Sequence, residues 1–165
     1  MWQKNPNKKA VLLDESSLRH KAIELLARRE YSYAELESKL LPFSEEEAPV
    51  YTVLDWLIEM GLQSDARYAK MYVRSKALGG YGPVRIRLEL KQKGINEFLM
   101  DDAFFEAESE VSWPDEVDRL IEKKAKSLDL ADFKDKNKVM GYLQRRGFSL
   151  DQIYAGFERC KSQTV

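Results

Sequence analysis

The sequence predicts an all-α protein made of three tandem three-helix repeats that stack into an elongated, curved array. Apolar residues recur at helical spacing along most of the chain, serine caps and glycine stops punctuate them, and one helical pattern occurs three times. No long alternating run of β-branched residues competes with the helical period. Because a trio of short helices buries little surface alone, neighbouring copies are expected to stack.

The repeat is clearest between the second and third copies. Lys93-Gly94-Ile95-Asn96 aligns with Arg146-Gly147-Phe148-Ser149 at a shift of 53 residues, which also places Ile86 and Leu90 on Val139 and Leu143. A shift of 50 residues places the same apolar pair on Leu36 and Leu40, where the copy ends without a glycine. The expected division is a tail over residues 1–14 and repeats over 15–62, 63–110 and 111–165.

In each copy, one helix precedes the central helix and another follows it. These outer helices are expected over roughly 17–29, 46–60, 65–78, 97–109, 115–126 and 150–160. Ser32, Ser44 and Ser149 each stand three residues before Glu or Gln, which is the spacing of a capping box. Pro83 and Pro114 suit first turns, and Gly61, Gly94 and Gly147 suit left-handed helix ends.

The composition excludes several classes of protein. With 165 residues, 44% of them hydrophobic and 33% charged, the chain has enough apolar mass for a core and is not disordered. Its apolar runs are too short to span a bilayer or to form a secretory signal, so we expect a cytoplasmic protein without membrane contact. The single cysteine, Cys160, fits a reducing compartment.

Charge is segregated along the chain although the net charge is only −1. Residues 66–95, the basic segment, hold eight bases and one acid, Glu89. Residues 96–118, the acidic segment, hold nine acids and no base. Such asymmetry concerns partners and electrostatic steering rather than the fold.

Residues 79–94 read GGYGPVRIRLELKQKG, a glycine-rich loop followed by a basic helix over 83–93. The loop lacks the spacing of a phosphate-binding loop, and Pro83-Val84 stand where Lys and Ser or Thr are required. Glycines that turn the chain so that Pro83 can start a helix account for the loop itself. They do not account for the bases, since an ordinary solvated face mixes charges of both signs.

The bases of two consecutive helices are therefore the candidate contacts with a partner. Ile86 and Leu90 form the buried stripe of the second helix, which leaves its bases nearer solvent. Tyr68 and Tyr81 are taken as exposed rings that could stack on nucleic-acid bases, although packing is the alternative for each. The candidate binding residues are Arg67, Lys70, Arg74, Tyr81, Arg85, Arg87, Lys91 and Lys93.

No catalytic or metal site is predicted. His20 is the only histidine and is interpreted as a surface or boundary residue, and no serine or cysteine has a plausible base beside it. Acid pairs such as Asp101/Asp102 and Asp115/Asp118 lie near helix starts, where they complement the helix dipole. We therefore expect no enzyme activity, no metal and no cofactor.

The chain resembles the RecX family of bacterial recombination regulators over roughly residues 15–160. The specific block runs from Asp65-Ala66-Arg67-Tyr68-Ala69 through Gly80-Tyr81-Gly82-Pro83 to Lys93-Gly94-Ile95, flanked by weaker matches at 32–40 and 143–148. The resemblance implies a helical repeat protein that binds the RecA recombinase and RecA-coated single-stranded DNA. It also implies suppression of ATP hydrolysis, strand exchange and the coprotease activity of the filament.

The resemblance and the charge pattern together suggest action by occupancy. Bases on the inner side of the array would lie in the groove of a nucleoprotein filament, with the acidic segment outside, and the protein would favour one filament state over another. We expect a monomer with weak direct DNA binding. Two alternatives remain: a module that binds nucleic acid directly, and a helical adaptor that binds none.

Overall fold

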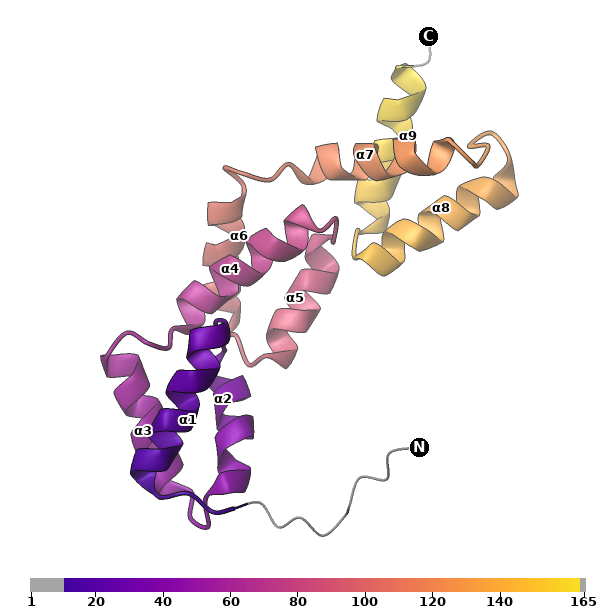
Figure 1. Cartoon of the computed structure of the whole chain (residues 1–165). Coiled ribbons are helices and arrows are strands. Elements are labelled where there is room, and N and C mark those ends of the chain that lie inside the picture. Colours follow the sequence, from indigo (N-terminus) through magenta and orange to yellow (C-terminus); the bar gives the residue numbers. More distant parts are fainter. Residues whose placement is uncertain (1–10, 164–165) are drawn as a thin grey trace, which may run out of the picture. The chain divides into compact units, whose positions relative to one another are not determined.

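The computed structural model describes residues 11–163, and all its secondary-structure elements over that range are helices (Figure 1). Most of the tail predicted over residues 1–14 lies outside the described residues. The elements are α1 (Glu15–Arg28), α2 (Tyr33–Leu40), the 3₁₀ helix η1 (Leu41–Phe43), α3 (Ala48–Glu59), α4 (Asp65–Leu78), α5 (Pro83–Gln92), α6 (Glu97–Ala107), α7 (Trp113–Ala125), α8 (Phe133–Arg146) and α9 (Leu150–Ser162). The prediction of an all-α protein with tandem three-helix repeats is confirmed.

The chain forms two compact units, and the boundary between Tyr68 and Ala69 lies inside α4. The first unit holds α1, α2 and α3, and the second holds the helices from α5 to α9 with most of α4. The elongated, curved arrangement of the repeats stays a prediction. Among the described helices, none is long and apolar enough to cross a membrane.

The first unit is built on the apolar stripes of α1, α2 and α3. Leu18 of α1, Leu36 and Leu40 of α2, and Leu57 of α3 are fully buried in one cluster. The Ser32 hydroxyl accepts a hydrogen bond from the Glu35 amide (3.2 Å) and so caps α2, as its spacing predicts.

The capping box predicted at Ser44 and Glu47 is wrong. The Ser44 hydroxyl donates to the Glu46 carbonyl (2.6 Å), and α3 begins only at Ala48, with Glu47 as a cap residue that makes no side-chain bond. The reason is the 3₁₀ turn η1, which ends in an extended Ser44 and uses the Ser44 amide to close on the Leu41 carbonyl (3.2 Å). In the first repeat, which has no glycine at this position, α2 therefore ends in a tight 3₁₀ turn.

The second unit contains the repeats around α5 and α8. Val73 of α4 and Ile86 and Leu90 of α5 are fully buried, and α5 packs beside α6. A separate cluster, including Ile121, Leu143 and other residues of α7, α8 and α9, forms the core of the third repeat. There α7 and α9 cross closely at Gly156, where a Cβ atom would lie 2.5 Å from a methyl carbon of Val117.

The capping box predicted at Ser149 and Gln152 is confirmed, and the predicted prolines and glycines mark helix starts and ends. Pro83 and Pro114 occupy the first turns of α5 and α7. Gly61, Gly94 and Gly147 have φ angles of 69°, 77° and 102°, in the left-handed region expected after a helix.

Candidate nucleic-acid and partner interface

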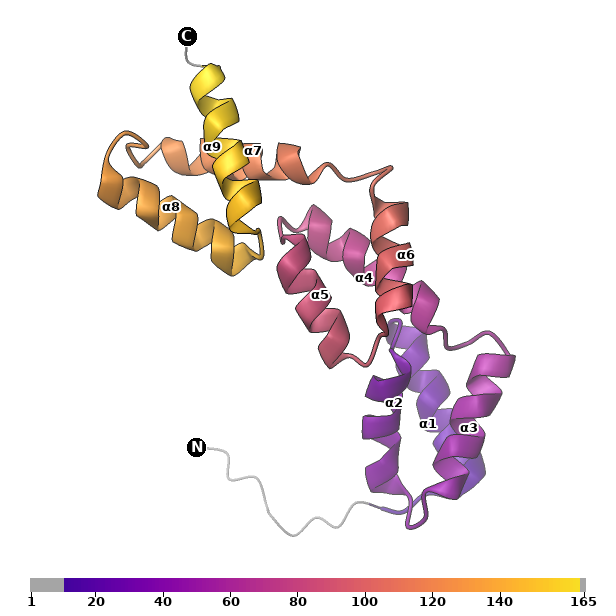
Figure 2. The same ribbon diagram turned by 180° about the vertical axis from the view of Figure 1, so that it is seen from behind.

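The loop that joins α4 to α5 docks on the end of α8. The amide of Gly82 donates to the Arg146 carbonyl (2.7 Å), and the amide of Val84 donates to the Gly147 carbonyl (3.0 Å). Figures 1 and 2 show this loop beside the connection between α8 and α9 in both views. The glycine-rich stretch at residues 79–82 therefore joins the second repeat to the third by backbone hydrogen bonds.

The approach at this junction is so close that two of its residues cannot carry a side chain. A Cβ atom on Gly82 would lie 2.4 Å from the carbonyl carbon of Gly147, and one on Gly147 would lie 2.3 Å from the Cβ atom of Arg85. Both contacts involve atoms that cannot swing away. The sequence analysis assigned these glycines only to a turn and a helix stop, whereas they also allow two repeats to touch.

Cations and tyrosine rings alternate across the same junction. We define the junction ladder as Tyr72, Lys76, Tyr81, Arg85, Lys124, Tyr142 and Arg146. The cation-to-ring distances are 5.5 Å for Lys76–Tyr72, 5.0 Å for Lys76–Tyr81, 4.5 Å for Arg85–Tyr81, 4.7 Å for Arg146–Tyr81, 5.5 Å for Arg146–Tyr142 and 4.1 Å for Lys124–Tyr142. A ring face attracts a cation without neutralising its charge, so the ladder concentrates positive charge.

Two guanidinium groups fix the ladder to the backbone of the opposite repeat. Arg85 donates from Nη1 to the Arg145 carbonyl (3.1 Å), and Arg146 donates from Nη1 to the Gly79 carbonyl (3.3 Å). Both guanidinium groups lie over the Tyr81 ring, at 4.5 and 4.7 Å from its centre. Its ring therefore packs within the protein, which is the alternative that the sequence left open for it, while remaining partly exposed.

One carboxylate, Glu89, accompanies the ladder. It accepts hydrogen bonds from the Tyr72 hydroxyl and from Arg85 Nε (2.9 Å), and it lies 3.8 Å from Lys76 Nζ. Burial acts to raise the pKa of the Glu89 carboxyl, but the bonds from Tyr72 and Arg85 and the charge of Lys76 outweigh it and hold the pKa below its ordinary value. The hydrogen bond to Glu89 in turn raises the pKa of Arg85.

The acidic segment folds back on the basic segment within the second unit, contrary to the expectation that it lies outside. Carboxylates of α6 and of the turn that follows it meet bases of α4 and α5. The ion pairs are Lys70–Glu106 (3.2 Å), Arg74–Glu110 (2.8 Å) and Arg87–Asp101 (2.8 Å). The expectation that these two helices present a face with almost only positive charges is therefore wrong. Basic and acidic residues that are separate in the sequence lie next to each other in the folded repeat.

The remaining bases of α5 differ from Arg87. Lys91 is exposed, and within residues 11–163 it forms no ion pair. Lys93 is partly buried at the end of α5, where its amide closes on the Glu89 carbonyl (3.1 Å). Lys91 thus stays a candidate contact in solvent.

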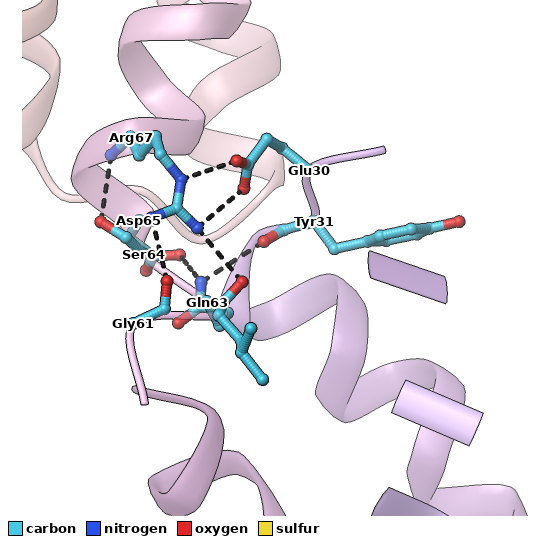
Figure 3. A network of polar contacts seen from close by, with 8 residues as sticks. Glu30, Tyr31, Gly61, Gln63, Ser64, Asp65 and Arg67 are labelled. Atoms are coloured by element: carbon cyan, nitrogen blue, oxygen red, sulfur yellow. Dashed lines mark hydrogen bonds and ion pairs between the residues drawn. The ribbon is translucent and has the colours of Figure 1, made fainter. Parts of the chain in front are cut away.

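Arg67 belongs to the first unit and serves its structure (Figure 3). Its Nε atom lies 2.6 Å from Glu30 Oε1. Its Nη1 and Nη2 atoms donate hydrogen bonds of 3.1 Å to the carbonyls of Gly61 and Leu62, respectively. The guanidinium therefore holds the loop that follows α3. We omit Arg67 from the contacts proposed below because its donors are already engaged.

Beside Arg67, a buried amide completes the network in Figure 3. Gln63, which is only 3% exposed, donates from Nε2 to the Tyr31 carbonyl (3.3 Å) and to Asp65 Oδ1 (2.9 Å). Tyr68 on the next turn is 2% exposed, so it is not an exposed ring and packing, the alternative left open for it, is confirmed. Helical spacing alone did not reveal that this tyrosine fills the core.

The sequence analysis missed the third repeat's part of the ladder. Lys124, Tyr142 and Arg146 come from α7 and α8, more than forty residues after the end of the loop, and were treated only as parts of a repeat. The signal that could have found two of them is a ring and a base one helical turn apart in α8, Tyr142 and Arg146, with the base directly before Gly147. Within the described part of the chain, no three His, Cys, Asp or Glu side chains converge as metal ligands would.

The fold and the junction define a class: a helical repeat protein built from three-helix units that presents a basic, tyrosine-lined surface. Two family models match the chain, the second three-helix domain of RecX at residues 64–103 and the third at residues 116–155.

Relatives and solved structures agree with these family models. Regulatory protein RecX of Halorhodospira halophila is 37% identical over 139 residues, covering 84% of this chain and 85% of that protein. Its counterpart in Pseudomonas fluorescens is 38% identical over 137 residues, covering 83% and 87%. A crystal structure of RecX from Lactobacillus salivarius has a TM-score of 0.77 at 26% identity, covering 88% of this chain and 96% of that one. The chain belongs to the RecX family of regulatory proteins.

Proposed function

We propose that this protein is a negative regulator of the RecA recombinase that binds the RecA–single-stranded DNA filament. Binding inhibits the ATPase, strand-exchange and coprotease activities of the filament. Membership of the RecX family supports the regulatory role, and the junction ladder is the observation that supports a site for it. Neither ATP hydrolysis nor a metal is needed by the regulator, which acts in the cytoplasm by occupancy.

The junction ladder suits a nucleoprotein filament because it holds several cations in fixed positions. Four cations of the ladder stand against one carboxylate, Glu89, so phosphates or acidic protein groups are attracted. The tyrosine rings lie beneath these cations and hold them in place, so the contacts with a single strand are made mainly by the lysine and arginine side chains. Lys91 extends the basic surface along α5.

The ion-paired bases of the second repeat contribute less in this proposal. Lys70 and Arg87 each face a carboxylate of α6, and Arg74 faces Glu110 just after α6, which partly cancels their attraction for a phosphate. These three residues are thus secondary contacts. Lys93 lies at the end of α5 and is also secondary.

A matched pair of double variants tests the site. Lys76→Gln with Lys124→Gln removes two ladder cations, and Lys70→Gln with Arg74→Gln removes the same charge from the ion-paired face. We expect the ladder variant to need about tenfold more protein for half-inhibition of DNA-dependent RecA ATPase, and the control less than about twofold. Thermal melts should show that both variants fold, and equal loss in both would reject the ladder as the site.

The second candidate function is direct binding of single-stranded nucleic acid, which the interleaved rings and cations favour. Titration of bare and RecA-coated strands over a salt series separates the two functions. A filament regulator prefers the coated strand by a wide margin. A nucleic-acid module binds both strands and loses affinity steeply as salt rises, because binding releases counterions.

A further inference from the structure

A pocket in the third repeat is lined by none of the ladder residues and is not used by the proposed function. Its volume is about 720 Å³, within the range of small-ligand and peptide-anchor sites. Leu128, Leu130 and Phe157 give it apolar walls, and Lys126, Lys136 and Lys161 also line it. The loop after α7, the start of α8 and the end of α9 enclose it.

The loop that forms one wall is held in place by hydrogen bonds. The Leu128 amide closes on the Lys124 carbonyl (3.0 Å), and the Asp129 amide donates to Asp135 Oδ2 (3.0 Å). The Ala131 amide then donates to Asp129 Oδ1 (2.9 Å). A wall that is already ordered costs little entropy on binding, so the pocket is pre-organised for an occupant.

The charges around the pocket favour an anionic occupant. Three lysines line it against one acid, Asp129, whose carboxylate already accepts a bond from the loop. Within residues 11–163, Lys126 and Lys136 form no ion pair, and Lys136 Nζ lies 5.0 Å from the centre of the Phe157 ring. Lys161 pairs with Glu158 at 3.4 Å in a solvent-exposed position.

We propose that this pocket binds an acidic protein segment that inserts one apolar side chain between Leu128, Leu130 and Phe157. The carboxylates that flank the apolar side chain then meet the lysines. The apolar walls favour this occupant over nucleic acid, because they present aliphatic side chains and a single ring that Lys136 already covers. A partner of this chemistry is recognised by an anchor together with negative charge.

Cys160 lines the pocket and is the only cysteine in the chain, so it reports occupancy without any substitution. Burial raises the pKa of its thiol, so alkylation should be followed at alkaline pH. The probe is an acidic peptide with one phenylalanine flanked by aspartates. Control peptides replace the phenylalanine by serine or the aspartates by asparagine. We expect the acidic probe to slow alkylation at least fivefold, and neither control peptide to slow it appreciably at the same concentration.

Variants give a second, independent measurement by fluorescence anisotropy of the labelled probe. Lys126→Gln with Lys136→Gln, and separately Ala131→Trp, which fills the pocket from an exposed loop position, should each weaken binding at least tenfold. The matched control, Lys123→Gln with Lys134→Gln, removes two exposed lysines that do not line the pocket and should change binding less than twofold.

Two results would overturn the proposal. One is probe binding that survives Ala131→Trp or the loss of the phenylalanine, which would place the peptide elsewhere. The other is protection of Cys160 by oleate or by a single-stranded oligonucleotide but not by the probe, which would assign the pocket to a lipid or nucleic acid. Because the ladder is untouched, loss of probe binding with RecA inhibition intact would leave the proposed function standing.

Discussion

The second unit handles its positive charge in two different ways. On the face formed with α6, bases meet carboxylates, as in the Arg74–Glu110 pair at 2.8 Å. At the junction ladder, bases lie over tyrosine rings, as Arg146 does between Tyr81 and Tyr142. The first arrangement pairs each base with a carboxylate of its own, whereas the ladder sets four cations against one carboxylate, Glu89, and so keeps most of its positive charge. We therefore expect positive charge in the sequence to mark a binding surface only where the fold places few acids beside it.

Breaking the junction itself should have the largest effect. Gly82→Ala forces a methyl group against the Gly147 backbone at 2.4 Å, and we expect it to lower the free energy of unfolding of the second unit by about 3 kcal/mol. Gly61→Ala is the control, since φ is also positive there but no atom lies within 4 Å; we expect it to cost about 1 kcal/mol. Urea denaturation measures both. Equal costs would show that the two repeats do not touch as described.

Removing one cation from each kind of surface should separate the two directly. Arg146→Ala deletes contacts with two rings and the bond to the Gly79 carbonyl, and we expect it to cost about 2 kcal/mol of stability. Arg74→Ala deletes an ion pair whose side chains are 64% and 53% exposed, and we expect a cost within about 0.5 kcal/mol. Thermal unfolding of the two variants in the same buffer makes the comparison, which fails if Arg74→Ala costs as much.

Acid should weaken the ladder at Glu89. Its pKa is lower in the folded protein than the ordinary value of 4.5, so the stabilisation that it provides is present above that pH and is lost as pH falls through the folded pKa. Glu89→Gln lacks this dependence. We expect the stability difference between wild type and variant to shrink steadily below pH 4.5 in urea titrations. A difference that stays constant down to about one pH unit below 4.5 would exclude this role.

Freeing the ion-paired bases should have the smallest effect on stability. Glu106→Gln with Glu110→Gln releases Lys70 and Arg74, and each lost pair should change the free energy of unfolding by about 0.5 kcal/mol or less. The released bases should tighten binding to single-stranded DNA by about twofold at low salt, with the gain vanishing at high salt. A gain that persists at high salt would mean that these pairs do not act through charge.

The sequence predicted the parts of the structure that depend on local chemistry. Helical spacing, proline in first turns and glycine stops are properties of a few neighbouring residues, so α5 and the left-handed Gly94 and Gly147 could be predicted. The capping box predicted at Ser44 does not form because the 3₁₀ turn η1 uses the Ser44 amide, and the Ser44 hydroxyl bonds to the Glu46 carbonyl. The local sequence pattern does not show which of the two arrangements, the capping box or the 3₁₀ turn, is more stable.

Only the part of the candidate site that lies in the second repeat could be predicted from the sequence, for a different reason. Arg85 and Tyr81 were chosen for charge and ring type, but the partners of Arg85 include Arg145, sixty residues away. Contacts over such separations depend on how repeats touch, which periodicity does not encode. The same limit concealed the pairing of α6 acids with α4 bases.

The backbone hydrogen bonds of the junction allow hydrogen exchange to report how often the second and third repeats separate. The amides of Gly82 and Val84 donate to carbonyls of the next repeat rather than to their own helix, and Pro83 between them has no amide hydrogen. The Ile86 amide donates to the Gly82 carbonyl, within its own repeat. In deuterated water, the exchange rates of the Gly82 and Val84 amides therefore report the opening of the junction. The exchange rate of the Ile86 amide reports the local opening of the first turn of α5.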